Sequence, residues 1–129
     1  MSATLELQLL PGRMAVCQLP ADAEPPLWCL RAPGFCSLTR TAEEWSAVCA
    51  EEAVPENIRR ETGWRLFRVA GTLDFSLTGV MASIAGPLGD AGVSLFAIAT
   101  YDTDYVMVKA DRLDQATAAL RAAGHVVRL

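Results

Sequence analysis

The sequence predicts an α+β fold, and three patterns in the second half of the chain carry this prediction. Residues 64–70 alternate in character as a half-buried β-strand does. Residues 93–100 and 105–109 form two apolar runs around a polar turn, which indicates a hairpin. Apolar residues elsewhere recur at three- and four-residue steps, which is typical of one helical face. One such stripe consists of Leu77, Val80, Met81, Ile84, Leu88 and Ala91, and a second of Leu113, Ala116, Leu120 and Ala123.

The first helical stripe has recognisable ends. Asp74 or Ser76 can cap its start, and Gly92 can end it. Pro87 lies inside the stripe and removes one helical hydrogen bond, so we expect a bend there. Residues 93–100 are apolar at nearly every position, which predicts a strand buried on both faces.

The second stripe completes a recognisable order of elements. Residues 111–114 form a candidate N-cap with acidic residues in the first turn, and Gly124 is a candidate stop. A short closing strand is expected over residues 125–129. The order from residue 64 is therefore β-α-β-β-α-β, with four antiparallel strands in one sheet and both helices on one face. This is the ferredoxin-like arrangement.

The first half of the chain is less regular. Residues 5–10 and 14–19 are short apolar runs around Pro11 and Gly12, which predicts a hairpin. Residues 21–31 can hold a short helix of a turn or two, because the prolines in this segment limit its length.

Two more strands are expected over residues 35–39 and 45–49. The second of these segments also fits a helix by its spacing, and we favour the strand. The polar residues 54–63 are expected to connect the halves. The predicted organisation is thus a complete module over residues 64–129 and an incomplete second copy over residues 1–63, packed on the same core.

Composition excludes several classes of protein. The chain is 52% hydrophobic and 20% charged, which is unlike a disordered protein. It has no apolar stretch of about 20 residues that could cross a bilayer, and Glu6 interrupts the first apolar run, so a signal peptide is not expected. The net charge of −4 argues against nucleic acid and anionic membrane surfaces as partners.

Metal binding and catalysis are also disfavoured. No C-x-x-C motif is present, and His125, the only histidine, is expected to be structural or exposed. No nucleophile–base pair is visible, so we expect no enzyme, no metal and no cofactor. The cysteines have apolar neighbours, which favours small buried hydrophobes in a reducing cytoplasm over a redox or disulfide role. They are Cys17, Cys29, Cys36 and Cys49.

One pair of segments suggests a ligand site. Residues 77–80 lie where a strand's loop enters a helix, and unpaired N–H groups at a helix N-terminus attract a carboxylate. Gly79 has no side chain, so a ligand can approach that backbone closely. Residues 100–104 add a hydroxyl, an aromatic ring and two carboxylates. Together the two segments could hold the carboxylate and ammonium of an amino acid.

Several motifs resemble the ACT domain family, and within it the bacterial tandem-ACT proteins similar to the CASTOR arginine sensors. The resemblance covers residues 64–129 well and residues 1–63 less closely. It implies a small-molecule ligand, usually an amino acid, in the crevice between two ACT modules, and it implies a strand over residues 45–49. The motifs are Asp74-Phe75-Ser76-Leu77-Thr78-Gly79-Val80, Ile84-Ala85-Gly86-Pro87-Leu88, Ala91-Gly92-Val93-Ser94, Ala99-Thr100-Tyr101-Asp102-Thr103-Asp104-Tyr105, Phe35-Cys36-Ser37-Leu38-Thr39-Arg40-Thr41 and Trp45-Ser46-Ala47-Val48.

The resemblance also implies which residues face the ligand. Leu77 departs in character from an arginine sensor, because a guanidinium needs an anionic partner and an acidic residue would be expected nearby. A ligand with a smaller or apolar side chain therefore fits better. The implied ligand-facing residues are Ser46, Ala47, Leu77, Thr78, Gly79, Val80, Thr100, Tyr101 and Asp104.

Two functions of different classes follow. The favoured one is a non-catalytic regulatory protein that binds an amino acid. The other is a structural module that forms homodimers through an exposed sheet edge and whose crevice is vestigial. Ligand-induced stabilisation separates the two, because a scaffold without a ligand site gains none.

Overall fold

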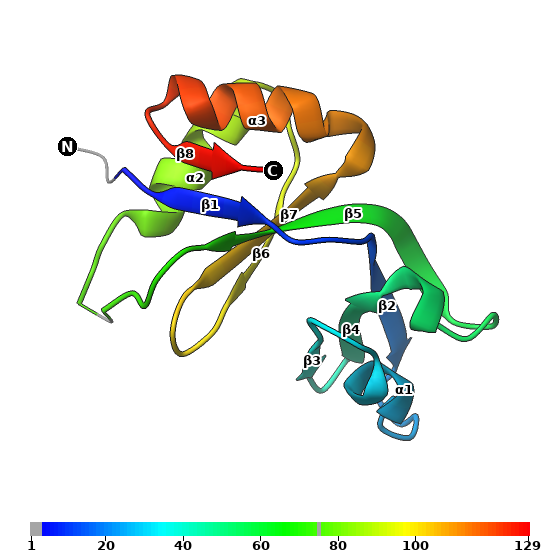
Figure 1. Cartoon of the computed structure of the whole chain (residues 1–129). Coiled ribbons are helices and arrows are strands. Elements are labelled where there is room, and N and C mark those ends of the chain that lie inside the picture. Colours follow the sequence, from blue (N-terminus) through cyan, green and yellow to red (C-terminus); the bar gives the residue numbers. More distant parts are fainter. Residues whose placement is uncertain (1–3, 75) are drawn as a thin grey trace. The chain divides into compact units, whose positions relative to one another are not determined.

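The computed structural model describes residues 4–74 and 76–129, so Phe75 of the first motif lies outside the described residues. The chain divides into two compact units (Figure 1). The smaller unit is Gly12–Trp64, and the larger unit combines residues 4–11 with Arg65–Leu129. The junction after residue 64 lies next to the expected boundary, whereas the N-terminal segment belongs with the second half of the chain.

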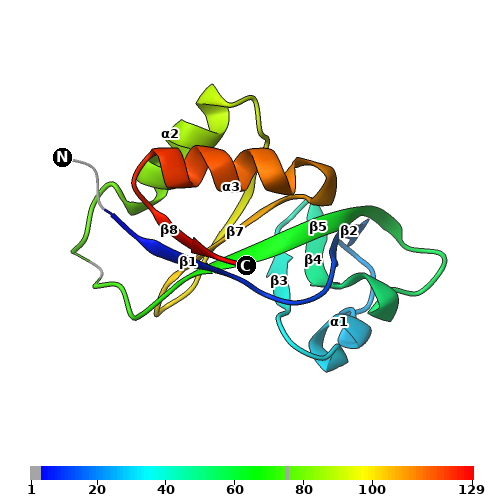
Figure 2. The same ribbon diagram turned by 45° about the horizontal axis from the view of Figure 1, so that its top comes forward.

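The larger unit has the expected ferredoxin-like α+β architecture. Helices α2 (Val80–Asp90) and α3 (Leu113–Ala122) lie on one face of its sheet (Figures 1 and 2). The helices and the sheet enclose one hydrophobic core. The strand order is β8-β1-β5-β7-β6. These strands are β1 (Glu6–Leu9), β5 (Arg59–Val69), β6 (Phe96–Ala99), β7 (Asp104–Lys109) and β8 (Val126–Arg128).

Strand β1 is a fifth strand that the sequence analysis did not place in this sheet. Leu7 of β1 pairs antiparallel with Val69 and parallel with Val127, so β1 lies between β5 and β8. The expectations of four antiparallel strands and of a hairpin between the first two strands were therefore wrong. Leu7 is completely buried in the core, and this non-local burial is the physical reason for the pairing.

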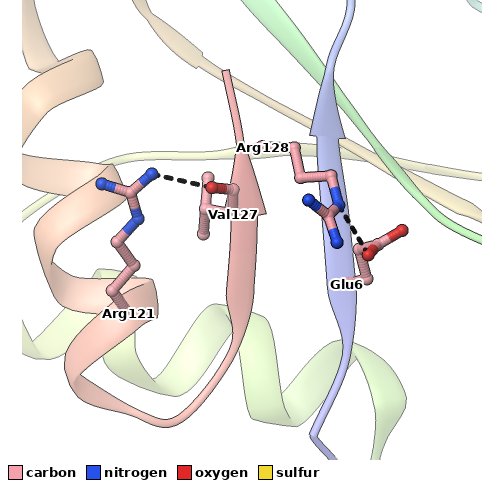
Figure 3. A network of polar contacts seen from close by, with 4 residues as sticks. All are labelled: Glu6, Arg121, Val127 and Arg128. Atoms are coloured by element: carbon pink, nitrogen blue, oxygen red, sulfur yellow. Dashed lines mark hydrogen bonds and ion pairs between the residues drawn. The ribbon is translucent and has the colours of Figure 1, made fainter.

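Polar contacts join β8 to β1 on one side and to α3 on the other, as Figure 3 shows. Arg128 Nε lies 2.7 Å from Glu6 Oε1 on β1. Arg121 of α3 donates a 2.7 Å hydrogen bond from Nη2 to the carbonyl oxygen of Val127. The closing strand is thus attached both to the N-terminal strand and to the last helix.

Two strands differ from their expected form. Strand β6 was expected over residues 93–100 and buried on both faces, but it begins at Phe96 and is only half-buried. In the described residues it pairs with β7 alone, so it is an edge strand with a solvent-facing side. Strand β5 begins at Arg59 inside the expected connection, because pairing with β2 orders a polar segment whose side chains face solvent.

Helix α2 begins later than expected. Its N-cap is Gly79, and within the described residues no side chain caps it, so the expectation that Asp74 or Ser76 does so was wrong. Asp74 instead closes a turn before the helix by accepting hydrogen bonds from the backbone N–H and hydroxyl of Ser76, both at 2.8 Å. After the C-cap, Gly92 has a φ of +73°, which agrees with its expected role as a stop.

Pro87 leaves one carbonyl oxygen of α2 without its helical hydrogen bond, and His125 contacts that oxygen. Pro87 has no N–H to donate to Ser83, four residues earlier. The carbonyl oxygen of Ser83 instead lies 2.7 Å from Nε2 of His125. The other ring nitrogen, Nδ1, accepts a 3.1 Å hydrogen bond from the N–H of Leu5, just before β1. His125 is 4% exposed, so it is a buried structural residue that joins α2 to the N-terminal segment.

The smaller unit contains α1 (Leu27–Arg31) and a sheet with the order β3-β4-β2-β5. The segment over residues 45–49 is a strand, which settles the alternative in favour of the strand. No helix in the described part of the chain is long and apolar enough to cross a membrane. The further elements are β2 (Met14–Pro20), β3 (Ser37–Arg40), β4 (Glu44–Ala50) and two single 3-10 turns, η1 (Glu51–Ala53) and η2 (Ala110–Arg112).

Candidate functional site

A pocket of about 190 Å³ lies in the larger unit. Two of its walls are segments that the sequence analysis selected, the approach to α2 and the turn between β6 and β7. The backbone N–H of Leu73 donates a 2.6 Å hydrogen bond to the carbonyl oxygen of Asp102, which ties these segments together. The lining residues are Leu73, Asp74, Leu77, Val80, Ala99, Thr100, Tyr101, Asp102, Thr103 and Asp104.

The helix entrance offers an open approach to the backbone. Gly79 has a φ of +76°, a conformation that residues with a Cβ rarely adopt. A Cβ built on Gly79 would meet nothing within 4 Å. The first hydrogen bond of α2 runs from the N–H of Ser83 to the carbonyl oxygen of Gly79. The backbone N–H groups between Gly79 and Ser83, in the first turn of α2, therefore have no partner within the helix and can receive an anion.

The turn at the other wall is held by its own side chains. The hydroxyl and the N–H of Thr100 each donate to the carbonyl oxygen of Thr103, both at 2.9 Å. The buried hydroxyl of Thr103 donates a 2.7 Å hydrogen bond to the carbonyl oxygen of Val69 on β5. Tyr101, at the tip, is 80% exposed. Its own hydrogen bonds and the bond to β5 thus hold the turn, and the side chain of Tyr101 at its tip is exposed to solvent.

The pocket is acidic. Three carboxylates line it, those of Asp74, Asp102 and Asp104, and the described lining residues include no basic group. Hydrogen bonds from the backbone N–H and the hydroxyl of Ser76 lower the pKa of Asp74, so this carboxylate stays ionised at neutral pH. The site therefore favours a ligand that carries a cationic group.

The structure brings five of the expected ligand-facing residues into this pocket: Leu77, Val80, Thr100, Tyr101 and Asp104. Thr78 and Gly79 precede Val80 in the chain but do not line the pocket.

Ser46 and Ala47 lie on β4 in the smaller unit. The side chain of Ala47 is completely buried in a hydrophobic cluster of that unit, and a role for either residue in binding stays a prediction.

Five lining residues were not among the expected ligand-facing residues: Leu73, Asp74, Ala99, Asp102 and Thr103. Asp102 and Thr103 belong to the predicted turn, although the ACT resemblance did not imply that they face the ligand. Asp74 was interpreted as a helix cap. Its place in the pocket follows from the turn that it forms with Ser76, which separates it from the helix start.

Comparison with known proteins agrees with this architecture. A model of the ACT domain matches residues 59–122, and a model of an N-terminal domain matches residues 12–57. The chain belongs to the ACT domain family. The ACT match begins at the start of β5 and ends with α3, so it contains every residue that lines the pocket.

Curated relatives of this ACT-domain chain include human proteins of the CASTOR group. The chain is 31% identical over 87 residues to the human putative protein CASTOR3P, covering 57% of this chain and 53% of the relative. It is 41% identical over 49 residues to the human cytosolic arginine sensor for mTORC1 subunit 1, covering 37% of this chain and 15% of that protein. The chain thus spans about half of the first relative and a much smaller share of the second.

A solved structure extends the likeness over nearly the whole ACT-domain chain. Protein Atu0741 from Agobacterium tumefaciens superposes with a TM-score of 0.92 at 32% identity, covering 98% of this chain and 93% of that one. Both units of this chain therefore have counterparts in one protein of similar length.

The described residues contain no group of three or more histidine, cysteine, aspartate and glutamate side chains that could hold a metal ion. Apart from the three carboxylates, the remaining side chains in the lining of the pocket are aliphatic, hydroxyl or phenol groups.

Proposed function

We propose that this ACT-domain protein is a non-catalytic regulator that binds an amino acid in the pocket of its larger unit. The observation that carries the proposal is the pocket itself, which joins an open helix entrance to a rigid acidic turn. Membership of the ACT family and similarity to an arginine sensor support a regulatory role.

The groups of an amino acid match the two walls of the pocket. Its carboxylate would accept hydrogen bonds from the free N–H groups that follow Gly79. Its ammonium would face Asp102 and Asp104 across the pocket. The side chain would lie against Leu73 and Leu77.

The acidic lining changes the expected preference among amino acids. Arginine was not expected as the ligand because an acidic residue was missing near Leu77, but Asp74 lines the same pocket and supplies an anionic group. We therefore propose that neutral and cationic amino acids bind and that aspartate and glutamate are excluded by charge repulsion.

A thermal-shift screen of the twenty standard amino acids tests this function. Ligand at 100 times its Kd stabilises the folded state by about 2.7 kcal/mol, which raises the Tm by several degrees in a chain of this size. The proposal predicts such a shift for at least one neutral or cationic amino acid and none for the acidic ones. A screen without any shift would contradict the proposal.

Asp104→Asn should lose most of the ligand affinity. A charge-assisted hydrogen bond to an ammonium contributes about 1.5–3 kcal/mol, so we expect Kd to rise by at least tenfold in calorimetry. Asparagine can keep the local turn contacts, and the Tm without ligand should stay within a few degrees. The control is Asp111→Asn, at an exposed carboxylate in η2 outside the pocket. Equal affinity in the two variants would remove Asp104 from the site.

Gly79→Asp and Gly79→Asn form a matched pair at the helix entrance. Both side chains tolerate the left-handed conformation at a modest cost and have similar volumes. Only aspartate places an anion where the ligand carboxylate is proposed to lie. We therefore expect calorimetry to show no binding to Gly79→Asp and weaker but measurable binding to Gly79→Asn. The same affinity for both variants would count against a carboxylate at this position.

The edge strand β6 favours the second candidate function, a structural module that forms homodimers. Its outer side has no partner strand within the described residues, and Ala97 and Ala99 are exposed. An open edge of this kind can pair with a second copy. Dimers in solution combined with a screen that shows no ligand would support this function in place of sensing.

A further inference from the structure

All four cysteines of the chain gather in the smaller unit, around one hydrophobic cluster that the pocket does not involve. Cys17, Cys29 and Cys49 are buried within the cluster, and the half-buried Cys36 packs against it. Two of these cysteines come from neighbouring strands. Ala15 pairs with Cys49 and Cys17 pairs with Ala47, so Cys17 and Cys49 are diagonal neighbours on one face of the sheet.

Cys29 reaches this face from α1. Its Sγ lies 3.6 Å from the carbonyl oxygen of Val48, the residue before Cys49, and 3.8 Å from that of Ser37. Cys29 and Cys49 are buried in the same hydrophobic cluster, and the contact with Val48 places the Cys29 sulfur beside the backbone of β4 just before Cys49. Nineteen residues separate Cys29 from Cys49 in the sequence, and the fold places both in the cluster between α1 and the sheet.

The two thiols differ in acidity. The hydrogen bond from Cys49 lowers the pKa of Cys29 to about 7, against the opposing effect of burial. The same hydrogen bond and burial raise the pKa of Cys49. Burial raises the pKa of Cys17 to about 11 and also raises that of Cys36. The lowered pKa of Cys29 and the raised pKa of Cys49 favour Cys29 as the thiol that reacts first.

Helix α1 gives a reagent a route to the buried pair. It has only five residues and no side-chain hydrogen bond at its N-cap, and such a short helix is marginally stable. Leu27 and Leu30 on its outer side are about half exposed. Local opening of α1 would expose Cys29 without unfolding the sheet beneath it.

We propose that Cys29 and Cys49 are a redox-active thiol pair, which a hydroperoxide oxidises to an intramolecular disulfide that joins α1 to β4. With hydrogen peroxide, the thiolate of Cys29 attacks one oxygen, the O–O bond breaks, and the released hydroxide takes a proton to become water. The Cys49 sulfur then attacks the Cys29 sulfenic acid, the S–O bond breaks, and a second water leaves with the proton of the Cys49 thiol. Two thiols and one peroxide thus give one disulfide and two waters.

Peptide mapping after hydrogen peroxide treatment of the folded full-length protein tests the pair. The expected intact mass falls by two hydrogens and returns with a dithiol reductant. Trypsin should then release residues 14–31 linked to residues 41–59. The first of these peptides holds both Cys17 and Cys29, so Cys17→Ser assigns the link to Cys29.

Matched serine variants complete the test. The link should persist in Cys17→Ser and Cys36→Ser and disappear in Cys29→Ser and Cys49→Ser. A link of residues 32–40 to either neighbouring peptide would assign the reaction to Cys36 and overturn the proposal. Oxidation without any intramolecular link in the wild-type protein would overturn it as well, whether or not the variants fold.

The pH dependence gives an independent readout. With a thiolate that forms around pH 7, the rate of disulfide formation should rise up to about pH 8 and change little from there to pH 9. A thiol of the usual pKa of 9.0 would instead react about fivefold faster over that last unit. That rise would contradict the role of Cys29 as the attacking thiol.

Discussion

Removal of residues 1–11 is expected to abolish the cooperative fold of the larger unit. Strand β1 lies between β5 and β8, so its removal leaves both of these strands without a neighbour on that side. The completely buried Leu7 is lost from the core with it. Domains of this size have only about 5–15 kcal/mol of stability, which such a loss can exceed. If the protein without residues 1–11 kept the helical circular-dichroism signal of α2 and α3 and lost it in one cooperative thermal transition, this expectation would be contradicted.

Two substitutions within β1 separate core burial from surface charge. Leu7→Ala should lower the free energy of unfolding by about 2–5 kcal/mol in urea titrations, because it opens a cavity in the core. Glu6→Gln removes the ion pair with Arg128, both of whose side chains are partly exposed, and should cost at most about 1 kcal/mol. Similar losses in the two variants would show that β1 does not contribute to the core as described.

His125→Phe is expected to cause a second large loss of stability. Phenylalanine keeps the ring but leaves the N–H of Leu5 and the carbonyl oxygen of Ser83 without their partner. Each unsatisfied buried group costs about 1–3 kcal/mol, so urea titrations should show a loss of several kcal/mol.

Pro87→Ala provides a specific rescue of that loss. An alanine at position 87 has an N–H that can donate to Ser83 in the ordinary helical pattern. We therefore expect Pro87→Ala to stabilise the His125→Phe protein by about 1 kcal/mol or more and to change the wild-type protein little. Purely additive effects in this double-mutant cycle would refute the link between the proline and the histidine.

The elements with strong local patterns were predictable from the sequence, and those that depend on distant partners were not. The stripe from Val80 to Leu88 identified α2 because its period is local. The place of β1 could not be deduced in the same way. Its pairing with Val69 and Val127 depends on burial of Leu7 against residues more than sixty positions away. Pro11 and Gly12 favoured a local hairpin, and the distant core overrode it.

In the candidate site, too, the parts with local sequence patterns were predictable and the parts that depend on distant contacts were not. Gly79 and the turn over residues 100–104 were selected because helix entrances and hairpin turns have recognisable sequences. Asp74 was missed as a lining residue because its place depends on a tertiary contact, the hydrogen bond between Leu73 and Asp102 that brings the two loops together. The extent of β6 was overestimated because an apolar run does not reveal which strand lies at the edge of a sheet.

Amide chemical-shift mapping by NMR, during titration with an amino acid that raises the Tm, tests the central claim most directly. If the ligand occupies the pocket, the largest shifts should fall on the amides of Val80, Met81 and residues 100–104, and they should saturate together with a single Kd. The amides of α1 should change little. Saturable shifts confined to residues outside the pocket lining, with the amides of Val80 and residues 100–104 unchanged, would contradict the site that we propose.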